Sequence, residues 1–242
     1  MTTEPVSVAM AVHNGLPFLR EQVESILSQL EGDDELVVID DASSDGSLQW
    51  LTEHASSRLR VESQSVNAGI RRTFERAFRA TRHPIVFLAD QDDVWLPGKR
   101  AAFVRTFAAD PGVLVVVSDA ELVDRDGRLL SPSFMATRGG FRRTWWATLV
   151  RNRYLGCAMA VRRSLLEKAL PIPPRAPMHD MWLGALGSTL GRVVYLPTPL
   201  LRYRRHGGNA TPSTHRSVPR MLADRWGLLT ALAIRRLALR RR

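Results

Sequence analysis

The sequence predicts an α/β protein with a mostly parallel central sheet and helices on both of its faces. Two observations lead to this fold class. Over the first 120 residues, short runs rich in β-branched residues alternate with longer stretches whose apolar residues recur at helical spacing. In addition, polar or acidic residues directly follow several of these runs, as expected where parallel strands end at one edge of a sheet.

Five apolar runs in this first half are expected to be strands, because each is short and is bounded by turn residues. They are Val6–Val12, Glu35–Asp40, Leu59–Glu62, Ile85–Ala89 and Val113–Ser118. A stretch with helical periodicity follows each of the first four runs. We therefore expect the sheet to be built from successive β-α-β units.

Helices are expected between these strands, and proline and capping residues predict where they start. The first helix carries Pro17 in its first turn, and the fourth is opened by Pro97 and extends to about Ala109. Ser44 is expected to cap the second helix. The third helix is predicted from an apolar stripe made of Ile70, Phe74, Ala77 and Phe78.

The alternation loosens after residue 120, and this second half is expected to continue the same sheet. Asp126-Gly127 predicts a hairpin turn between two apolar pairs. Gly156–Val161 and Arg192–Leu196 are expected to be strands, and His179–Leu190 a helix. Residues 1–219 are therefore expected to form one domain, with halves of about 1–120 and 121–219.

The net charge of +10 comes from the C-terminal end of the chain. From Leu200 onward there are 11 arginines and one acid, so the first 199 residues have no net charge. This argues against nucleic-acid binding by the main domain. The single cysteine, Cys157, excludes an internal disulfide. With no secretory signal and no run of about 18 apolar residues, a cytoplasmic protein is expected.

An acidic segment directly follows the strand expected at Ile85–Ala89. It reads Asp90-Gln91-Asp92-Asp93 and contains a D-x-D sequence. Carboxylates this close repel one another unless a cation or hydrogen-bond donors compensate. Mg²⁺ and Mn²⁺ favour carboxylate oxygens and usually share their coordination with substrate phosphates. The segment is thus a candidate metal and diphosphate site; the alternative is a solvated acidic turn. No G-x-G-x-x-G follows the first strand, which argues against a dinucleotide oxidoreductase.

Seven segments, spread in order over about 200 residues, resemble family 2 glycosyltransferases, which have the GT-A fold. They are Val6–Asn14, Val38–Ser47, Asn67–Gly69, Ala89–Trp95, Gly156–Met159, Met178–Asp180 and His206–Asn209. The string Ala-Asp-Gln-Asp-Asp-Val-Trp at residues 89–95 is similar to that of a bacterial subgroup that includes rhamnosyltransferases of surface polysaccharides. No single segment is specific for this family, but the seven segments in this order are. The resemblance implies a nucleotide-binding N-terminal half and an acceptor-side C-terminal half.

The resemblance implies an inverting, metal-dependent glycosyltransferase. It would move a hexosyl or deoxyhexosyl group from a UDP- or dTDP-sugar to a hydroxyl of a glycan or lipid-linked acceptor, in cell-surface polysaccharide synthesis. Its cofactor would be a divalent cation, Mg²⁺ or Mn²⁺. Two alternatives stay open: an inactive protein of the same fold that binds a nucleotide sugar, and a nucleic-acid-binding module that uses the basic tail.

The resemblance implies that the nucleotide is bound by Val12, Asn14, Asp41, Asn67, Gly69 and Asp90. Among these, Asp90 is similar to the carboxylate that meets the ribose. Asp41 would accept a hydrogen bond from the imide N–H of uracil or thymine, and the charge of a carboxylate strengthens such a bond. The alternative for Asp41 is to cap the following turn together with Ser43 and Ser44.

Three further residues are implied to act on the diphosphate and the acceptor. Asp92 is similar to the family's metal ligand, and His206 to a late metal or diphosphate ligand, although a lone histidine can equally be structural. Asp180 resembles the catalytic base, which would take the proton of the acceptor hydroxyl as its oxygen attacks the anomeric carbon. Asp180 starts a predicted helix, where backbone N–H groups favour a carboxylate, and it could also be an ordinary helix residue.

Residues 220–242 place leucines, alanines and Trp226 at roughly helical spacing among arginines. A basic amphipathic helix of this kind can lie on the inner face of the cytoplasmic membrane. The alternative is a helix that packs on the domain and has a frayed basic end. Nucleic-acid binding is not expected, since the rest of the chain is neutral overall.

Overall fold

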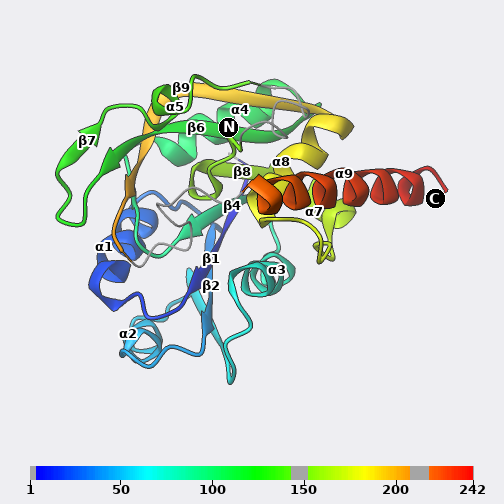
Figure 1. Cartoon of the computed structure of the whole chain (residues 1–242). Helices are drawn as coiled ribbons and strands as arrows, with labels where there is room; N and C mark the ends of the chain where they lie inside the picture. Colours follow the sequence, from blue (N-terminus) through cyan, green and yellow to red (C-terminus); the bar gives the residue numbers. More distant parts are fainter. Residues whose placement is uncertain (1–3, 143–151, 208–217, 242) are drawn as a thin grey trace.

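The computed structural model describes residues 4–142, 152–207 and 218–241 (Figure 1). Within these residues, nine strands form a single sheet with the order β3-β2-β1-β4-β8-β6-β9-β5, and β7 pairs with β6. The strands are β1 (Val6–Val12), β2 (Glu35–Asp41), β3 (Leu59–Gln64), β4 (Ile85–Asp90), β5 (Val94–Trp95), β6 (Val113–Val123), β7 (Leu129–Ser131), β8 (Met159–Arg162) and β9 (Arg192–Arg204).

Helices connect most of these strands. They are α1 (Leu16–Leu27), α2 (Ser47–Glu53), α3 (Ile70–Ala80), α4 (Lys99–Ala109), α5 (Phe134–Thr137), α7 (Arg163–Ala169), α8 (His179–Leu190) and α9 (Val218–Arg240), with a 3₁₀ turn, η1, at Gly156–Ala158. Figure 1 shows α1 and α3 on opposite sides of β1 and β2. The predicted α/β fold with helices on both faces of the sheet is confirmed.

The N-terminal half of the sheet is parallel, as predicted. β1 pairs in parallel with β2 and β4, and β2 pairs in parallel with β3. The register sets Val12 beside Asp40, and Ala11 beside Asp90. The carboxyl ends of β1, β2 and β4 therefore meet at one edge of the sheet, which is where ligands bind in open α/β sheets.

The C-terminal half continues this sheet, as predicted, but with mixed strand directions. β8 runs antiparallel to both β4 and β6, and β9 runs parallel to β6. The expected strand Arg192–Leu196 extends to Arg204, although Pro197 and Pro199 lie within it. The β6–β9 pairing shifts register near these prolines, between Ser118 and Asp119, and such irregularities accommodate residues that cannot donate a ladder hydrogen bond.

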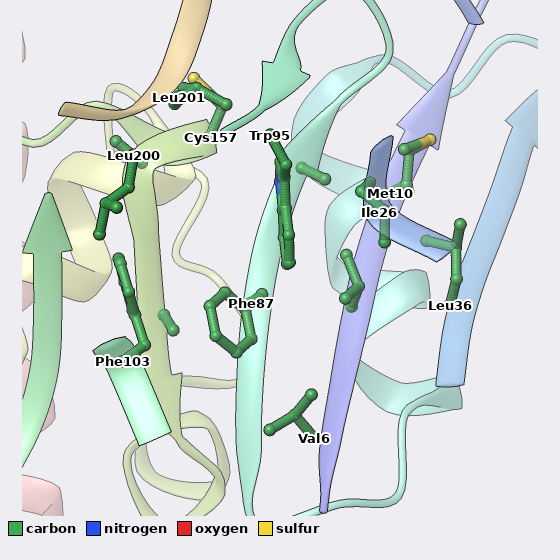
Figure 2. Close-up of a cluster of buried hydrophobic side chains, with 14 of the residues drawn as sticks. Val6, Met10, Ile26, Leu36, Phe87, Trp95, Phe103, Cys157, Leu200 and Leu201 are labelled. Atoms are coloured by element: carbon green, nitrogen blue, oxygen red, sulfur yellow. The ribbon is translucent and has the colours of Figure 1, made fainter. Parts of the chain in front are cut away.

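Two apolar clusters fill the two faces of the sheet, because successive side chains of a strand point to opposite faces. One cluster joins β4 to α1 and α4, and Figure 2 shows Phe87 between Phe103 and Trp95. The ring centroid of Phe87 lies 5.1 Å from that of Phe103 and 5.0 Å from that of Trp95. The other cluster joins the sheet to α3, α7, α8 and α9.

Several element boundaries differ from the sequence-based predictions. α2 begins at Ser47 after Gly46, whose φ of 93° suits glycine, so Ser44 is not its N-cap. In the same way, α4 begins at Lys99 after Gly98, two residues beyond Pro97. The predicted strand at Gly156 begins instead with the 3₁₀ turn η1. The hairpin at Asp126-Gly127 is confirmed by the antiparallel pairing of β6 and β7.

Helix α9 packs against the domain beside α8 (Figure 1). Leu228, Ala231 and Leu232 on one of its faces are buried, and the Arg235 guanidinium donates hydrogen bonds to the carbonyl oxygens of Lys168, Leu170 and Pro171. No helix among the described residues has both the length and the apolar character needed to cross a membrane.

Candidate active site

A cavity of about 340 Å³ lies at the carboxyl ends of β1, β2 and β4 and reaches the start of α8. It is lined by most of the site residues that the sequence predicts, namely Val12, Asp41, Asn67, Gly69, Asp90, Asp92 and Asp180. These residues come from both halves of the chain, so the fold brings the predicted nucleotide-side and acceptor-side groups to one cavity.

Asn14 and His206 are the two predicted site residues that do not line this cavity. The Asn14 side chain accepts a hydrogen bond from the Ser44 backbone N–H, at 2.8 Å, and so ties the loop after β1 to the loop after β2. His206 contacts the cavity wall indirectly, because its Nε2 lies 2.8 Å from Oδ2 of Asp92. Gly208 and Asn209, which follow in the same motif, lie outside the described residues.

Asp41 is buried at the end of β2 and holds the glycine loop that leads into α3. Its carboxylate accepts hydrogen bonds from the backbone N–H groups of Ala68 (2.7 Å) and Gly69 (2.9 Å) and from the Gln64 side chain (2.9 Å). Gly69 has a φ of 82°, which favours glycine at this position. The neighbouring turn is capped by Asp40, which accepts from the Ser43 N–H, and not by Asp41.

The acidic loop between β4 and β5 is fixed by partners that are far away in the sequence. The Gln91 side chain both accepts from the His13 N–H (2.7 Å) and donates to the His13 carbonyl oxygen (3.0 Å). On the other side, Arg204 donates its backbone N–H to the Asp93 carboxylate and its Nε–H to the Asp92 carbonyl oxygen, both at 3.0 Å. The loop is therefore held in one conformation between β1 and β9.

A fully buried lysine lies behind the acidic loop. Nζ of Lys99 donates a hydrogen bond to the Cys157 carbonyl oxygen at 2.6 Å and lies 4.5 Å from the centroid of the Trp95 ring. Burial lowers the pKa of Lys99 to about 8, and the negative charges nearby oppose this shift. Lys99 thus supplies a positive charge on the protein side of the carboxylates, which the sequence analysis did not identify.

Two carboxyl groups of this loop, those of Asp90 and Asp93, are buried close to other carboxylates. Burial raises the pKa of Asp90 to about 7, and the charges of Asp92 and Asp180 add to the shift. The pKa of Asp93 is also raised well above its usual value, by burial and then by the charge of Asp92. Such a site favours a bound cation, which would replace protons as the compensating charge.

Two sets of side chains could hold a divalent cation. The first is the predicted pair of Asp92 and His206, which faces the cavity through Asp92. The second is Asp90, Asp93 and Cys157, whose ligand atoms lie within 4.8 Å of one another. Burial raises the pKa of the Cys157 thiol well above its ordinary value, so the thiol stays protonated and is a poor ligand for the hard ions Mg²⁺ and Mn²⁺. The carboxylates and His206 fit such an ion better.

Asp180 lies at the start of α8 and lines the same cavity. Burial raises the pKa of its carboxyl to about 6, although hydrogen bonds from the backbone of Met181 and Gly156 and from the Asn152 side chain favour the charged form. A carboxyl with this pKa is ionised at neutral pH and is still basic enough to accept a proton. Its position and its pKa are both suited to a general base.

His179, next to Asp180, is a cavity residue that the sequence analysis did not assign. Its side chain is 3% exposed, and its ring stacks on Phe74 with centroids 4.0 Å apart. Neither of its ring nitrogens has a hydrogen-bond partner among the described residues. Trp182, by contrast, is fully buried and its Nε1–H donates to the Ala169 carbonyl oxygen, so it packs in the core.

The chain is similar in sequence to proteins named for glycosyl transfer and for O-antigen biosynthesis. An uncharacterized glycosyltransferase of Nostoc sp., alr2836, is 27% identical over 217 residues, which cover 84% of this chain and 66% of that protein. The O-antigen biosynthesis protein RfbC of Myxococcus xanthus is 27% identical over 216 residues, 86% of this chain and 16% of that protein. The chain thus spans only part of the length of these relatives.

A solved structure with a similar fold is that of S. aureus TarS in complex with UDP-GlcNAc. Its TM-score is 0.70 at 19% sequence identity, over 96% of this chain and 66% of that one, which supports the GT-A type of fold. Residues 7–170 match the family model described as Glycosyl transferase family 2. Since this match covers more than half of the sequence, the chain belongs to glycosyltransferase family 2.

Proposed function

We propose that this protein is an inverting glycosyltransferase that uses a UDP- or dTDP-sugar as its donor. The observation that carries the proposal is that Asp41, the acidic loop and Asp180 line one cavity. Asp41 would bind the pyrimidine base, for which its carboxylate keeps acceptor capacity beyond the three hydrogen bonds it already accepts. Asn67, Gly69 and Val12 would surround the nucleoside.

Asp180 would act as the catalytic base. Its carboxylate would take the proton of an acceptor hydroxyl while that oxygen forms a bond to the anomeric carbon of the donor. The bond from that carbon to the diphosphate oxygen would break on the opposite side, and its electron pair would leave with the nucleoside diphosphate. A single displacement of this kind inverts the anomeric configuration. The pKa of about 6 leaves Asp180 ionised at neutral pH.

The acidic loop would bind the diphosphate through Mg²⁺ or Mn²⁺, with Asp92 and His206 as the proposed ligands and Asp90 at the ribose. When bound, the cation would neutralise the charge that develops on the departing diphosphate. The rigid support of this loop by Gln91 and Arg204 would keep the ligands in place. In the absence of a cation, a pKa of about 7 leaves Asp90 partly protonated near neutral pH.

The donor class can be tested by slow hydrolysis. The protein is incubated with a panel of UDP-, dTDP- and GDP-sugars plus Mn²⁺ or Mg²⁺, and released nucleoside diphosphate is measured. We expect hydrolysis of at least one UDP- or dTDP-sugar and none of the GDP-sugars, because the two-ring guanine places its N–H donors farther from the ribose than the pyrimidine imide N–H that Asp41 would bind. Nucleotide binding without hydrolysis in any combination would favour an inactive protein of the same fold, and activity that survives EDTA would contradict the metal requirement.

We further propose that the acceptor is a glycan or lipid-linked glycan of a cell-surface polysaccharide. The name of RfbC, an O-antigen biosynthesis protein, supports this, and so does the resemblance of residues 89–95 to rhamnosyltransferases of surface polysaccharides. The product would then be made on the inner face of the cytoplasmic membrane. Residues 1–219 would form the transferase domain, and residues 220–242 would provide a peripheral membrane contact.

The outer face of α9 supports this membrane contact. It lies opposite the buried face of the helix and carries the exposed apolar residues Leu222, Trp226, Ile234 and Leu237, which are 56–69% exposed. Arg236 and Arg240 are exposed on the same helix, and Arg241 is exposed directly after its end. A helix with one apolar face on the protein and another facing out, next to arginines, suits an anionic lipid surface.

Binding to vesicles tests the membrane contact. We expect the whole chain to co-sediment with vesicles that contain anionic lipid, and the triple substitution of Arg236, Arg240 and Arg241 by alanine to weaken binding roughly 100-fold, since each arginine contributes about 1 kcal/mol. Removal of residues 220–242 is a poorer test, because it would uncover the surface under Leu228. Arg105→Ala, at an exposed arginine of α4, is the control. Equal binding of the wild type and the triple variant would contradict this part of the proposal.

A further inference from the structure

His179 is a buried polar side chain without a partner at the wall of the cavity. Its ring is 3% exposed and stacks on Phe74, and among the described residues both Nδ1 and Nε2 lack a hydrogen-bond partner. A buried polar group that stays unpaired costs about 1–3 kcal/mol, so native proteins seldom keep one without a reason. Phe74 already supplies its packing, which leaves the two nitrogens unexplained.

Gly156 lies directly beside the ring. A side chain at this position would place its Cβ 3.4 Å from Nε2 of His179 and 3.3 Å from Cβ of Asp180. Gly156 has no positive φ, so its backbone does not require glycine. The missing side chain instead lets the Gly156 backbone lie close to both His179 and Asp180, and all three residues line the cavity, which provides the room for a ligand group beside them.

The chemistry of the imidazole defines the ligand group. Burial lowers the pKa of His179 to about 3, so the ring is neutral at physiological pH, with one donating and one accepting nitrogen. A neutral ring favours an uncharged group that can both donate and accept over an ionised phosphate, which only accepts. In a donor bound as proposed above, the group between the diphosphate at the acidic loop and the base Asp180 is the sugar ring, whose hydroxyls both donate and accept.

We propose that Nε2 of His179 binds a hydroxyl of the donor sugar and that His179 thereby selects which sugar is transferred. This inference rests on the proposed function, because it assumes a nucleotide sugar in the cavity. It assigns His179 to the sugar and leaves the nucleotide to Asp41 and the acidic loop. His179 is thus a specificity residue, and loss of its nitrogens is expected to affect sugar binding without affecting nucleotide binding.

Calorimetric titration in Mn²⁺ separates these two contributions. For each UDP- and dTDP-sugar, the ratio of the Kd of the free nucleotide to the Kd of the nucleotide sugar gives the gain in affinity from the sugar. His179→Phe keeps the stacking on Phe74 and removes both nitrogens. We expect it to leave nucleotide affinity unchanged and to reduce the sugar gain of the preferred donor roughly tenfold, as the loss of a hydrogen bond predicts.

Monodeoxy analogues of the preferred sugar identify the hydroxyl. For the wild type, one analogue should show the same roughly tenfold loss of sugar gain. His179→Phe should bind that analogue and the parent sugar equally, because the substitution and the deoxy analogue remove the two partners of one hydrogen bond. His83→Phe is the matched control, because Nε2 of His83 is also buried and unpartnered but lies before β4, at the opposite edge of the sheet. His83→Phe should change neither the affinity for the nucleotide nor the affinity for the nucleotide sugar.

The outcomes distinguish this inference from the proposed function. If His179→Phe keeps the full sugar gain, the inference is wrong while the proposed function stands. If the wild type binds neither UDP nor dTDP, the proposed function fails, and the inference fails with it. Should His179→Phe not fold, Gly156→Ala provides the test. Its methyl group would lie 3.4 Å from Nε2 and crowd the sugar hydroxyl, so it should reduce the sugar gain but not nucleotide affinity; an unchanged gain would overturn the inference.

Discussion

Replacing Asp180 by asparagine is expected to lower the rate of glycosyl transfer by roughly 10²- to 10⁴-fold, the usual contribution of a general base. Asparagine has nearly the same shape as the protonated acid but cannot accept a proton from the acceptor hydroxyl. Affinity for the nucleotide should change little, because Asp41 and the acidic loop would bind it. Steady-state kinetics, together with nucleotide titrations of the same protein preparations, measure both quantities.

The same substitution should stabilise the fold. Burial raises the pKa of Asp180 from about 3.8 to about 6, so the folded protein binds the proton more tightly than the unfolded chain does. Stability from this group is therefore present at low pH and is lost as the pH rises from about 4 to about 6. At pH 7 the ionised carboxylate costs at most about 3 kcal/mol, since one pKa unit corresponds to about 1.4 kcal/mol. Asp180→Asn should raise Tm by roughly 2 to 8 °C at pH 7.

The pH dependence provides an internal check. For the wild type, kcat/KM should rise about tenfold per pH unit below the pKa of the base and level off above about pH 6. The stability gain of Asp180→Asn should disappear near pH 4, where the wild-type carboxyl is protonated in both states. Asp33→Asn, at an exposed carboxylate, should change neither activity nor Tm. An active Asp180→Asn variant would remove Asp180 from the role of base.

Local patterns were sufficient to predict the parallel half of the fold. Runs such as Val6–Val12 and Ile85–Ala89 are buried on both faces and form continuous apolar stretches, and the helices between them have clear apolar stripes. Because parallel strands end at one edge of the sheet, their order along the chain is enough to predict that the residues following them lie close together. Six of the nine predicted site residues line the cavity for this reason, and Asp180 joins them from the start of α8.

The other features depend on contacts between residues that are distant in the sequence. Lys99 lies in a helix whose periodicity gives no sign that its amine is buried against Cys157, 58 residues later. Asp41 resembles a turn cap because Ser43 and Ser44 follow it, but side chains alternate along β2, so Asp40 faces that turn and Asp41 faces the glycine loop. His179 could have been singled out, since it directly precedes the predicted base.

Asp92→Asn is expected to weaken nucleotide binding in Mn²⁺ by at least about 100-fold, because even residues that only support a metal ligand contribute 10- to 100-fold to metal affinity. Asparagine can keep the 2.8 Å contact with Nε2 of His206 while removing the charge. Removal of one of the crowded carboxylates also relieves repulsion on Asp90 and Asp93, so the variant should be at least as stable as the wild type. Titration of UDP or dTDP in Mn²⁺ and in EDTA measures the loss, which should vanish in EDTA.

The control for this prediction is Cys157→Ala, which distinguishes the two possible ligand sets. If the cation is held by Asp92 and His206, Cys157→Ala should keep its Mn²⁺-dependent nucleotide affinity, and His206→Gln should lose part of it. If the ion is held instead by Asp90, Asp93 and Cys157, Cys157→Ala should lose part of its Mn²⁺-dependent nucleotide affinity and His206→Gln should keep it. Asp92→Asn should then bind nucleotide almost normally. We expect the first result, because a cation shared with a diphosphate must face the cavity: Asp92 lines that cavity, while Asp93 and Cys157 are buried behind it.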